Sequence, residues 1–340
     1  MRTAVYIGDH NIETVEAVPV RPERGQVQIA VAYTGLCGTD LHIIHGSMDG
    51  RVTRPLAFGH EMSGTIAAIG EGITEWAVGD AVTVMPLEWD GTCPACLAGN
   101  SHICQNLVFV GIDSPGSLQE LWTVPADLLV RLPSGMSLSH AALAEPVAVA
   151  VHDVRRSELT TGDKVVVIGG GPIGVLIATV ARHAGAEVAV IEPEAGRRAQ
   201  IEELGFATVD PRGEDQVQWV ERWTDGAGAD VVFEVSGAAQ AVLGATALAK
   251  VRGTLVVVAI HPVPREIDLQ RLFWRELRIL GARVYQRTDF EEAVRLLGDG
   301  VIPADELISR IVPLDGIPAA IDDLENGRAL KVLVAVGGEQ

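Results

Sequence analysis

One glycine-rich turn constrains the fold of this chain more than any other segment. The apolar residues 165–168 run directly into Gly169-Gly170-Gly171-Pro172-Ile173-Gly174, and a helical pattern follows as far as residue 184. A continuous Val/Ile run favours a strand that is buried on both faces, and a glycine turn between such a strand and a helix is typical of a parallel βαβ unit. The segment therefore predicts a parallel sheet with helices packed on it.

The following residues repeat this alternation of apolar strands and helices. Continuous rather than alternating apolar runs again indicate strands buried on both faces. The expected strands are 164–168, 187–191, 230–235, 254–259 and 277–281, and the expected helices are 173–184 and 196–204. We predict an α/β fold class with a Rossmann-type, doubly wound parallel sheet in this region.

The first part of the chain has a different pattern. Short strands are expected at residues 26–33, 64–69 and 81–85, and Gly and Asp turns separate them. Frequent short strands with such turns favour a β-rich, barrel-type domain. The pattern changes near Glu145.

After residue 284 the sequence predicts a helix at 289–297 and a strand at 331–336, which we place back on the first domain. The predicted division is 1–147, 148–283 and 284–340, with the first and last segments forming one domain.

The glycine turn has the form of a dinucleotide-binding loop. Gly169 permits the tight turn, Gly171 lets the backbone approach a pyrophosphate, and Gly174 lets the helix pack close to the strand. The next strand ends in Glu192, about where an acid that binds ribose hydroxyls is expected. Its carboxylate would repel the 2′-phosphate of NADP, although Arg197 and the neighbouring arginine could soften this effect. We therefore expect NAD rather than NADP.

Four residues before the glycine loop are candidate ligands of a metal ion. They are Cys37, His60, Glu61 and Glu145. A thiolate, an imidazole and carboxylates suit Zn²⁺, and a site with few tight ligands keeps a position open for substrate. Glu61 and Glu145 could each bind zinc directly, act through water or exchange with solvent. Asp40 is expected to orient the ligands from behind.

Thr39 and His42 follow the thiol closely and are candidates for proton transfer. A hydroxyl two residues after the thiolate can touch a substrate oxygen on zinc, and an imidazole three residues further on can pass the proton to solvent. The alternative is a threonine that caps a helix and a histidine on its surface.

A cysteine-rich segment predicts a second zinc ion, of structural type. Cys93 and Cys96 have CxxC spacing, Cys104 follows, and Asp90 takes the position of a first ligand. Glu88 or His102 could replace Asp90. A redox disulfide between Cys93 and Cys96, or a lobe without metal, is the alternative.

Composition limits the partners of the protein. The formal net charge of −19 argues against nucleic acid and against anionic membrane surfaces, both of which require Lys and Arg. No run of the chain is long and apolar enough to span a bilayer, and the first residues lack the apolar core of a secretory signal. We expect a cytoplasmic protein.

Together these motifs resemble the zinc-dependent medium-chain dehydrogenases, and most closely the group of sorbitol, 2,3-butanediol and threonine dehydrogenases. The resemblance runs over nearly the whole chain. The segments that carry it are Gly35-Leu36-Cys37-Gly38-Thr39-Asp40, Gly59-His60-Glu61, Gly79-Asp80-Ala81-Val82, Glu145-Pro146-Val147-Ala148, residues 169–174, and Phe273-Trp274-Arg275-Glu276-Leu277.

The resemblance implies a GroES-like catalytic domain built from both chain ends, a Rossmann domain between them, and a homodimer or homotetramer. It implies catalytic zinc on Cys37, His60 and Glu61 with Glu145 beside it, and a relay through Thr39 and His42. It also places Glu192 and Arg197 at the adenosine ribose. The backbone near Val235, Ser236, Val258 and Ala259 would line the nicotinamide side. Asp90 departs from the group, which usually has cysteine there.

We therefore predict an NAD-dependent zinc oxidoreductase that interconverts a secondary alcohol and its ketone by hydride transfer, with a polyol, sugar alcohol or vicinal diol as substrate. Two alternatives remain: oxidation of an amino alcohol, as in threonine 3-dehydrogenases, and a non-catalytic NAD-binding regulator. The regulator would be expected to have a broken zinc or relay set.

Overall fold

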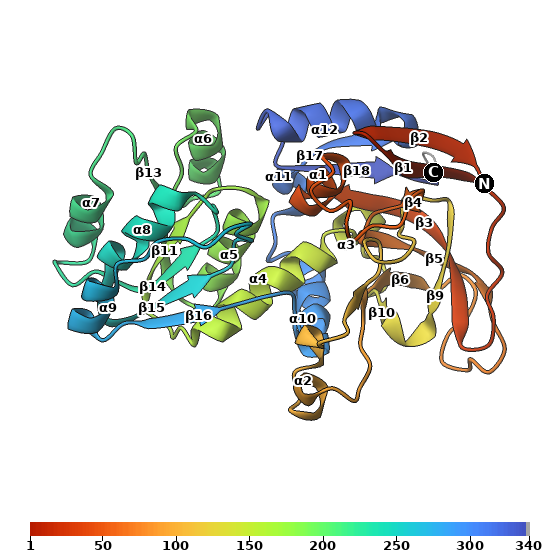
Figure 1. Ribbon diagram of the computed structural model, residues 1–340, viewed down its shortest axis with the longest axis horizontal. Coiled ribbons are helices and arrows are strands. Elements are labelled where there is room, and N and C mark those ends of the chain that lie inside the picture. The colour runs from red at the N-terminus through yellow and green to blue at the C-terminus, as the bar shows by residue number, and fades with distance from the viewer. Residues whose placement is uncertain (338–340) are drawn as a thin grey trace. The chain divides into compact units, whose positions relative to one another are not determined.

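The chain folds into two compact units in the computed structural model, which describes residues 1–337. The first unit contains Met1–Ala148 together with the described residues from Gln286 onward. The second unit contains Val149–Tyr285. Both chain ends therefore contribute to the first unit, as Figure 1 shows.

Two sheets form the framework of the first unit (Figure 1). The smaller has the order β2-β1-β4, and the larger has the order β10-β6-β5-β3-β18-β17, with β9 also paired to β3. The strands are β1 (Arg2–Gly8), β2 (Asn11–Glu16), β3 (Gln26–Leu36), β4 (Leu56–Ala57), β5 (Glu61–Ile69), β6 (Ala81–Val84), β9 (Leu121–Pro125), β10 (Leu129–Arg131), β17 (Ile308–Pro313) and β18 (Lys331–Ala335).

Shorter elements complete this unit. Its helices are α1 (Gly38–Ile44), α2 (Pro94–Leu97), α3 (Leu138–Ala141), α10 (Arg287–Gly298), α11 (Ala304–Leu307) and α12 (Ile317–Glu325). The short strands β7 (Leu87–Glu88) and β8 (Val108–Phe109) pair with each other. Single 3₁₀ turns lie at Ser101–Ile103, Ala126–Leu128 and Leu314–Gly316. The helix α4 (Ala144–Ser157) begins at the end of this unit's first segment.

Strand β3 organises the larger sheet, because β5, β9 and β18 all pair with it. Its side chains are mostly buried, and Val27 and Ile29 are fully so. The last strand of the chain, β18, pairs antiparallel with it, so that Val332 lies opposite Leu36. The expected strand near the C-terminus therefore packs against residues almost three hundred positions earlier.

The second unit contains a six-stranded parallel sheet in the order β13-β12-β11-β14-β15-β16. In chain order along the sheet this is the 3-2-1-4-5-6 arrangement of a dinucleotide-binding fold. The strands are β11 (Lys164–Ile168), β12 (Glu187–Ile191), β13 (Ala207–Val209), β14 (Ala229–Glu234), β15 (Ala249–Val257) and β16 (Arg278–Gly281). The helices that accompany them are α5 (Pro172–His183), α6 (Ala195–Glu203), α7 (Gln216–Trp223), α8 (Ala239–Leu248) and α9 (Leu269–Arg275).

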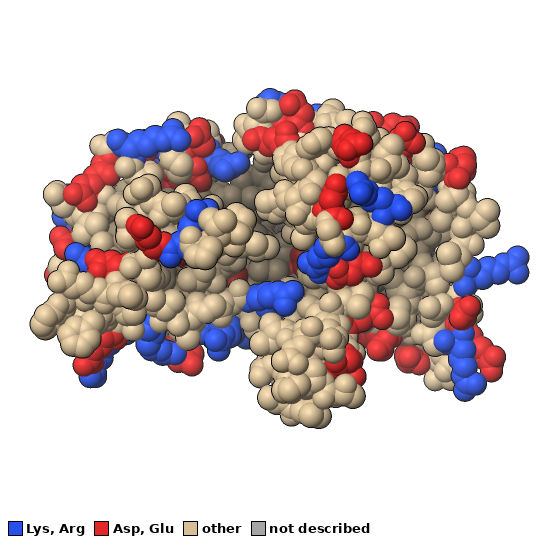
Figure 2. All heavy atoms as spheres, viewed as in Figure 1, with Lys and Arg blue, Asp and Glu red and all other residues tan. Residues whose placement is uncertain are grey.

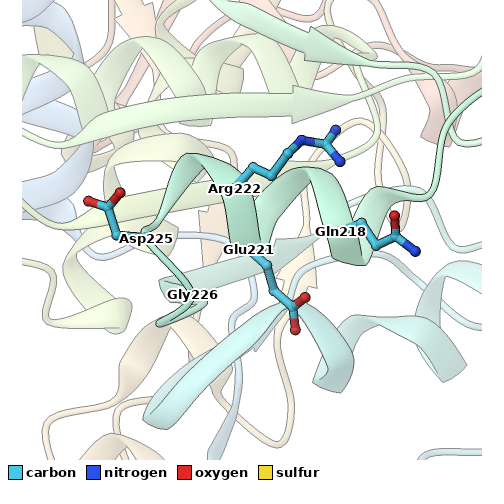
Figure 3. Close-up of a pocket in the computed structure, with 5 residues that line it drawn as sticks. All are labelled: Gln218, Glu221, Arg222, Asp225 and Gly226. Carbon is cyan, nitrogen blue, oxygen red and sulfur yellow. The ribbon is translucent and has the colours of Figure 1, made fainter.

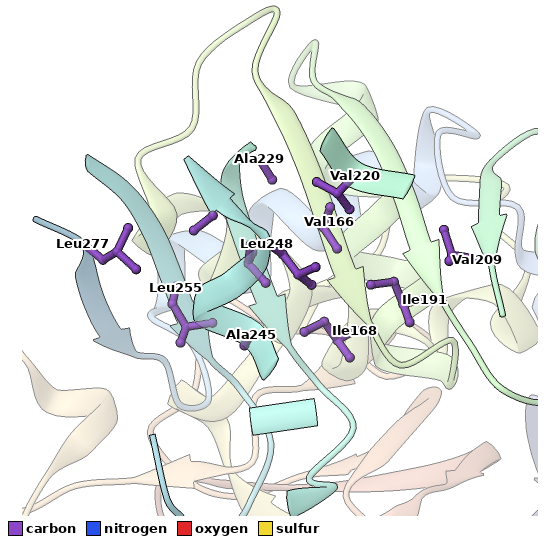
Figure 4. Close-up of a cluster of buried hydrophobic side chains, with 12 residues drawn as sticks. Val166, Ile168, Ile191, Val209, Val220, Ala229, Ala245, Leu248, Leu255 and Leu277 are labelled. Carbon is purple, nitrogen blue, oxygen red and sulfur yellow. The ribbon is translucent and has the colours of Figure 1, made fainter. Parts of the chain in front are cut away.

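Alternate residues of β11 face opposite sides of this sheet. Val166 and Ile168 enter an apolar cluster with Val220 of α7 and Leu248 of α8 (Figure 4). Val167 points to the other face, where Gly174 of α5 lies against it. Burial on both faces explains why the sequence of this strand is apolar without alternation.

The expected strands and helices are all present, with ends shifted by a few residues. The largest difference is β15, which starts at Ala249 rather than at Thr254. Its pairing with β14 jumps from Ala249 to Thr254, and Arg252 has a positive φ of 61°. Residues 250–253 therefore form a bulge inside a strand rather than a loop before it.

The surface is charged but mixed in sign. On the face that Figure 2 shows, acidic and basic side chains are interspersed over most of the molecule. The cysteine-rich lobe is an exception, because residues 91–107 contain no Lys, Arg, Asp or Glu. Among the described residues, no helix has both the length and the apolar character needed to cross a membrane.

Candidate active site

Three of the predicted metal ligands meet at one end of β3. Cys37 follows the last residue of β3 and caps α1, while Glu61 opens β5 and pairs opposite Gly35. His60 directly precedes Glu61. Potential ligand atoms of Cys37, His60 and Glu61 all lie within 4.8 Å of one another. Residues from separate segments thus form one compact donor set for a metal ion.

The position of the Glu61 side chain depends on Gly35, which lies opposite it on β3. A Cβ at this position would lie 2.2 Å from the Glu61 Oε2 atom, which no side chain could tolerate without displacing the carboxylate. The glycine therefore provides the space that the Glu61 side chain occupies.

The His60 ring is held between a thiol and a carboxylate. Its Nε2 atom lies 3.2 Å from Cys37 Sγ, and its Nδ1 atom lies 3.7 Å from Asp40 Oδ1. Both Nδ1 of His60 and Oδ1 of Asp40 are buried and make no hydrogen bond among the described residues. A metal ion on Nε2 would leave Nδ1 protonated and facing Asp40, which is a common arrangement behind histidine ligands.

Asp40 also organises the backbone around the thiol. Its Oδ2 atom accepts a hydrogen bond from the Cys37 N–H at 2.9 Å, and the Thr39 N–H donates to Cys37 Sγ at 3.3 Å. The orienting role expected of Asp40 is thus visible at the start of α1. The residue that caps this helix is Cys37, so the structure does not support the alternative in which Thr39 is the cap.

Lys331 is a member of this site that sequence reasoning missed. Its Nζ atom donates to Glu61 Oε1 at 2.9 Å and Oε2 at 2.6 Å, and to the Leu36 carbonyl at 3.2 Å. The Lys331 and Glu61 side chains are 4% and 2% exposed. The pairing of β18 with β3 places Lys331 here, and the sequence alone shows only a lysine before an apolar strand.

Glu145 lies in the first turn of α4 and is 5% exposed. It is outside the compact donor set of Cys37, His60 and Glu61. Its negative charge nevertheless acts on His60 and Lys331, since it contributes to raising the pKa of both. Glu145 therefore lies near enough to act on the cluster by its charge, but it does not belong to the set of possible metal ligands.

The charges of the cluster favour a bound cation. Burial and the nearby Asp40 raise the pKa of the Cys37 thiol, and burial raises the pKa of Asp40. Burial alone would lower the pKa of His60, but the charges of Cys37 and Asp40 outweigh it and hold that pKa well above its usual value. This buried space thus contains more acidic groups than the single cation Lys331 can neutralise. A thiolate, an imidazole and a carboxylate together form a donor set that fits Zn²⁺.

Thr39 and His42 lie three residues apart on α1, so they share one face of the helix. Thr39 is half-buried and His42 is exposed. This gradient from the thiol toward the surface is compatible with a path for a proton.

The cysteine-rich lobe forms a second donor set. Asp90, Cys93, Cys96 and Cys104 offer ligand atoms that lie within 4.8 Å of one another. The alternatives Glu88 and His102 are not members of this set. All four cysteines of the chain are free thiols, so the Cys93–Cys96 disulfide is not formed here.

The spacing of the sulfurs fits a tetrahedral metal ion. Cys93 Sγ lies 3.7 Å from Cys104 Sγ. With Zn–S bonds of about 2.3 Å, two sulfurs of a tetrahedral site would be about 3.8 Å apart. Backbone N–H groups of Gln105 and Asn106 donate to these sulfurs at 3.4 and 3.3 Å, which stabilises thiolates.

Asp90 holds the backbone of the lobe in place and can also bind a metal ion. Its Oδ1 atom accepts from the N–H groups of Thr92 and Cys93 at 2.8 and 2.9 Å, and Oδ2 accepts from the Asn106 side chain at 2.6 Å. These donors hold the pKa of Asp90 far below its usual range. A lone pair on Oδ2 remains for a metal ion.

The glycine loop of the second unit has the geometry of a phosphate cradle. Gly169 has a φ of 110°, and a Cβ at Gly174 would lie 1.9 Å from the Gly169 carbonyl oxygen. A Cβ at Gly171 would meet only open space. Gly171 caps α5, with Pro172 and Ile173 in its first turn, so the helix N-terminus faces that space. The loop fits a bound pyrophosphate.

Glu192 follows β12 and ties the glycine loop in place. Its carboxylate accepts from the Gly170 N–H and the Glu194 N–H, both at 2.8 Å. Arg197 is half-buried, and its Nε atom makes no hydrogen bond among the described residues. Arg198 is committed to the carbonyls of Glu192 and Pro193 and to Asp210. Of the two arginines, Arg197 is thus the one with an available donor.

The four residues expected beside a nicotinamide lie at the carboxyl ends of β14 and β15. The Val258 and Ala259 N–H groups both donate to the Glu234 carbonyl, and the Val235 N–H donates to the Ile168 carbonyl. Ser236 follows, and the buried Glu234 carboxylate accepts from its N–H and Oγ. This edge of a doubly wound sheet is where such folds bind ligands.

A pocket at α7 is unrelated to either donor set. It is lined by Gln218, Glu221, Arg222, Asp225 and Gly226. Figure 3 shows that the four drawn side chains point in different directions rather than toward one point. Polar groups that do not converge cannot define a ligand, so this pocket carries no functional assignment.

Comparison with known proteins supports membership of the zinc-dependent dehydrogenases for both units of the chain. A family model of the alcohol dehydrogenase GroES-like domain matches residues 23–134, and one of the zinc-binding dehydrogenase matches residues 172–299. A 2-dehydro-3-deoxy-L-galactonate 5-dehydrogenase from Pseudoalteromonas atlantica is 49% identical over 100% of both chains.

Solved structures give the same result. A zinc-binding dehydrogenase from Sinorhizobium meliloti, crystallised with NADP, has a TM-score of 0.92 at 33% identity and covers 98% of each chain. The 2R,3R-butanediol dehydrogenase from Bacillus subtilis has a TM-score of 0.90 at 31% identity, covering 98% of this chain and 99% of that one.

These matches confirm the predicted fold class, a Rossmann sheet plus a GroES-like domain, and the predicted function class. The chain belongs to the zinc-type medium-chain dehydrogenase/reductase family and is an oxidoreductase of alcohols or polyols.

Proposed function

We propose that this protein uses NAD⁺ to oxidise a secondary hydroxyl of a polyol, sugar alcohol or vicinal diol, and catalyses the reverse reduction. The observation that carries the proposal is the buried set of Cys37, His60 and Glu61 at the end of β3. A zinc ion held there would supply a Lewis acid that lowers the pKa of the substrate hydroxyl.

The residues around this donor set have separate tasks. Asp40 orients His60 from behind and holds the backbone at Cys37. Lys331 neutralises and positions Glu61. Thr39 accepts the hydroxyl proton as it releases its own toward His42, and His42 passes a proton to solvent from the exposed side of α1. Glu145 adds a further negative charge near His60.

The preference for NAD rests on Glu192. A carboxylate at the end of the second strand suits the ribose hydroxyls of NAD and opposes a 2′-phosphate. Arg197 offers an N–H donor beside Glu192, which would reduce the preference for NAD over NADP. A similar dehydrogenase is bound to NADP, so the affinities for both cofactors must be measured.

We further propose a structural zinc ion in the lobe of Asp90, Cys93, Cys96 and Cys104. The sulfur spacing and the N–H···S hydrogen bonds support it.

Self-association through the second unit is also proposed. Strand β16 ends the sheet, and Phe273 and Trp274 of α9 are each 73% exposed. An edge strand beside exposed aromatic residues favours isologous pairing of two copies, as in a homodimer or a homotetramer built from dimers.

The test is NADH formation by zinc-loaded protein across chiral diols, sugar alcohols, inositols, sugar acids and threonine. A stereoselective hit with NAD⁺, abolished in Cys37→Ser with NAD binding retained, supports the proposal. Activity on threonine alone would support the amino alcohol alternative. Silence across the panel with intact NAD binding would favour a non-catalytic role.

A further inference from the structure

The loop from Phe109 to Gly116 is fixed directly against the zinc-ligand segment. The Gly116 N–H donates to the Ala57 carbonyl at 2.6 Å, and the Ser117 N–H donates to the Gly59 carbonyl at 2.9 Å. A Cβ at either Gly111 or Gly116 would lie 2.2 Å from the Gly59 carbonyl oxygen. The backbone of this loop therefore keeps a constant position relative to His60.

Phe109 and Asp113 are the two ends of a tight turn within this loop. The Phe109 ring packs edge-on against the His60 ring, with centroids 5.2 Å apart and an interplanar angle of 84°. The Asp113 Oδ2 atom accepts from the Phe109 N–H at 2.8 Å, and the Asp113 N–H donates back to the Phe109 carbonyl at 2.8 Å. The Asp113 carboxylate is thus hydrogen-bonded to the backbone of the residue whose ring packs against His60.

Arg51 is held on this carboxylate by a two-pronged hydrogen bond. Its Nε donates to Asp113 Oδ1 at 2.5 Å and its Nη2 to Asp113 Oδ2 at 2.6 Å. The fork geometry fixes the plane of the guanidinium. Nη1 has no hydrogen-bond partner among the described residues, and the Arg51 side chain remains 39% exposed. A charged donor edge is therefore preorganised on the turn whose Phe109 ring packs against His60.

We propose that Arg51 binds a carboxylate of the substrate, so that the natural substrate is an acidic polyol, a sugar acid whose secondary hydroxyl reacts at the zinc centre. This inference rests on the proposed function and narrows its substrate class. The carbon chain would lie along the Phe109 ring, with the reacting hydroxyl at the His60 end and the carboxylate at the Arg51 end.

The charge balance supports a role beyond tying two loops together. The chain carries a net charge of −19, and the zinc cluster contains Asp40, Glu61 and nearby Glu145, so an anionic substrate needs a dedicated cation. Lys331 is buried on Glu61. The aspartate that pairs with Arg54 is Asp49, whereas the aspartate that pairs with Arg51 belongs to the turn that carries Phe109. A guanidinium has five N–H donors, of which Asp113 takes two, so Arg51 keeps donors for a second carboxylate.

The test compares an acidic with a neutral substrate in zinc-loaded, full-length enzyme. The acid is 2-dehydro-3-deoxy-L-galactonate, and the neutral substrate is the best diol or sugar alcohol of the panel. Arg51→Met removes the charge and keeps the stem, Arg51→Lys keeps a point charge without the fork, and Arg54→Met is the matched control. Thermal midpoints and zinc content report on folding.

We expect Arg51→Met to raise KM for the acid by about tenfold to a hundredfold, the usual loss for a charged hydrogen bond, with kcat/KM for the neutral substrate nearly unchanged. Arg51→Lys should recover part of the loss, and Arg54→Met should behave as wild type. Equal losses on both substrates would overturn the proposal and leave Arg51 a structural residue. So would a wild-type preference for the neutral substrate.

Failure of the proposed function is a separate result. If wild-type enzyme oxidises no panel member, calorimetric binding of the same acid, 2-dehydro-3-deoxy-L-galactonate, to wild type and Arg51→Met still tests the anion site. A tenfold weaker affinity in the variant supports Arg51, and identical affinities exclude it.

Discussion

Lys331 and Glu61, which lie at opposite ends of the sequence, form a buried ion pair in which Lys331 Nζ is 2.6 and 2.9 Å from the two carboxylate oxygens. Burial alone would lower the pKa of Lys331, but the charge of Glu61 outweighs it and raises that pKa, so the lysine stays protonated. The pair joins β18 to the end of β3 and β5 where the candidate metal ligands lie.

Replacing Lys331 with Met should destabilise metal-free protein by about 3–5 kcal/mol, because it leaves the Glu61 carboxylate buried without its partner. Denaturant unfolding would measure the loss. The double variant Lys331→Met/Glu61→Gln should regain much of it, and Lys331→Arg should lose less. A Lys331→Met protein as stable as wild type would show that the ion pair contributes nothing to the stability of the metal-free protein.

The donor set of Cys37, His60 and Glu61 was predictable because its members carry local signatures. Cys37, His60 and Glu61 lie in short glycine-containing segments whose residue types suit zinc, and the glycine loop lies between a strand and a helix. Local sequence contains this information. The role of Lys331 depends on which strand β18 joins, and strand pairing across almost the whole chain leaves no local signal.

Other missed features also lack a signal in the local sequence. The β1–β2 hairpin turns at Asp9 and His10 with φ of 51° and 63°, and this pair lacks the Asn-Gly or Asp-Gly signal of such turns. Arg51 is one of two arginines in an irregular segment, and only the folded position of Asp113 distinguishes it from Arg54.

Thr39→Ala should lower kcat by about a hundredfold to ten-thousandfold, the range for loss of a proton-transfer group, while NAD still binds. Thr39→Ser keeps the hydroxyl and should retain most of the turnover. Steady-state kinetics together with NADH fluorescence titration would separate chemistry from cofactor binding. Normal turnover in Thr39→Ala would remove Thr39 from the proton path.

The lobe should hold one of two zinc ions per chain. Cys104→Ser removes one ligand from the set of four that Cys104 forms with Asp90, Cys93 and Cys96, and a closed site needs all four. The zinc content should therefore fall from about two ions per chain to about one. Cys37→Ser should lose the other ion. A wild-type protein with a single zinc ion that Cys104→Ser retains would contradict the proposed lobe site.

Glu192→Ala should weaken NAD binding more than NADP binding, by about tenfold or more, because a charged hydrogen-bond acceptor for the ribose is lost. Glu192→Gln separates this effect from the support of the loop, since its carbonyl can still accept from the Gly170 N–H. Dissociation constants for both cofactors give the ratio. An unchanged NAD affinity in both variants would show that the ribose is bound elsewhere.

The last prediction concerns acid stability at Asp80, in the turn before β6. The Asp80 Oδ2 atom accepts from the Ala77 N–H at 2.9 Å, and Arg131 Nη1 lies 2.8 Å away. The backbone hydrogen bond and then Arg131 lower the pKa of Asp80. Because the folded-state pKa is the lower one, its stabilisation is fully present above the unfolded value of about 3.9 and is lost as pH falls through the folded value.

Asp80→Asn keeps an acceptor for the Ala77 N–H and removes the titrating charge. Its deficit in thermal midpoint relative to wild type should therefore be largest near neutral pH and should shrink as the pH falls below about 4. Thermal unfolding of both proteins across this range, at constant ionic strength, measures the difference. Because the other carboxylates titrate in both proteins, a deficit that stays constant from neutral to acidic pH would mean that the Asp80 charge contributes nothing to it.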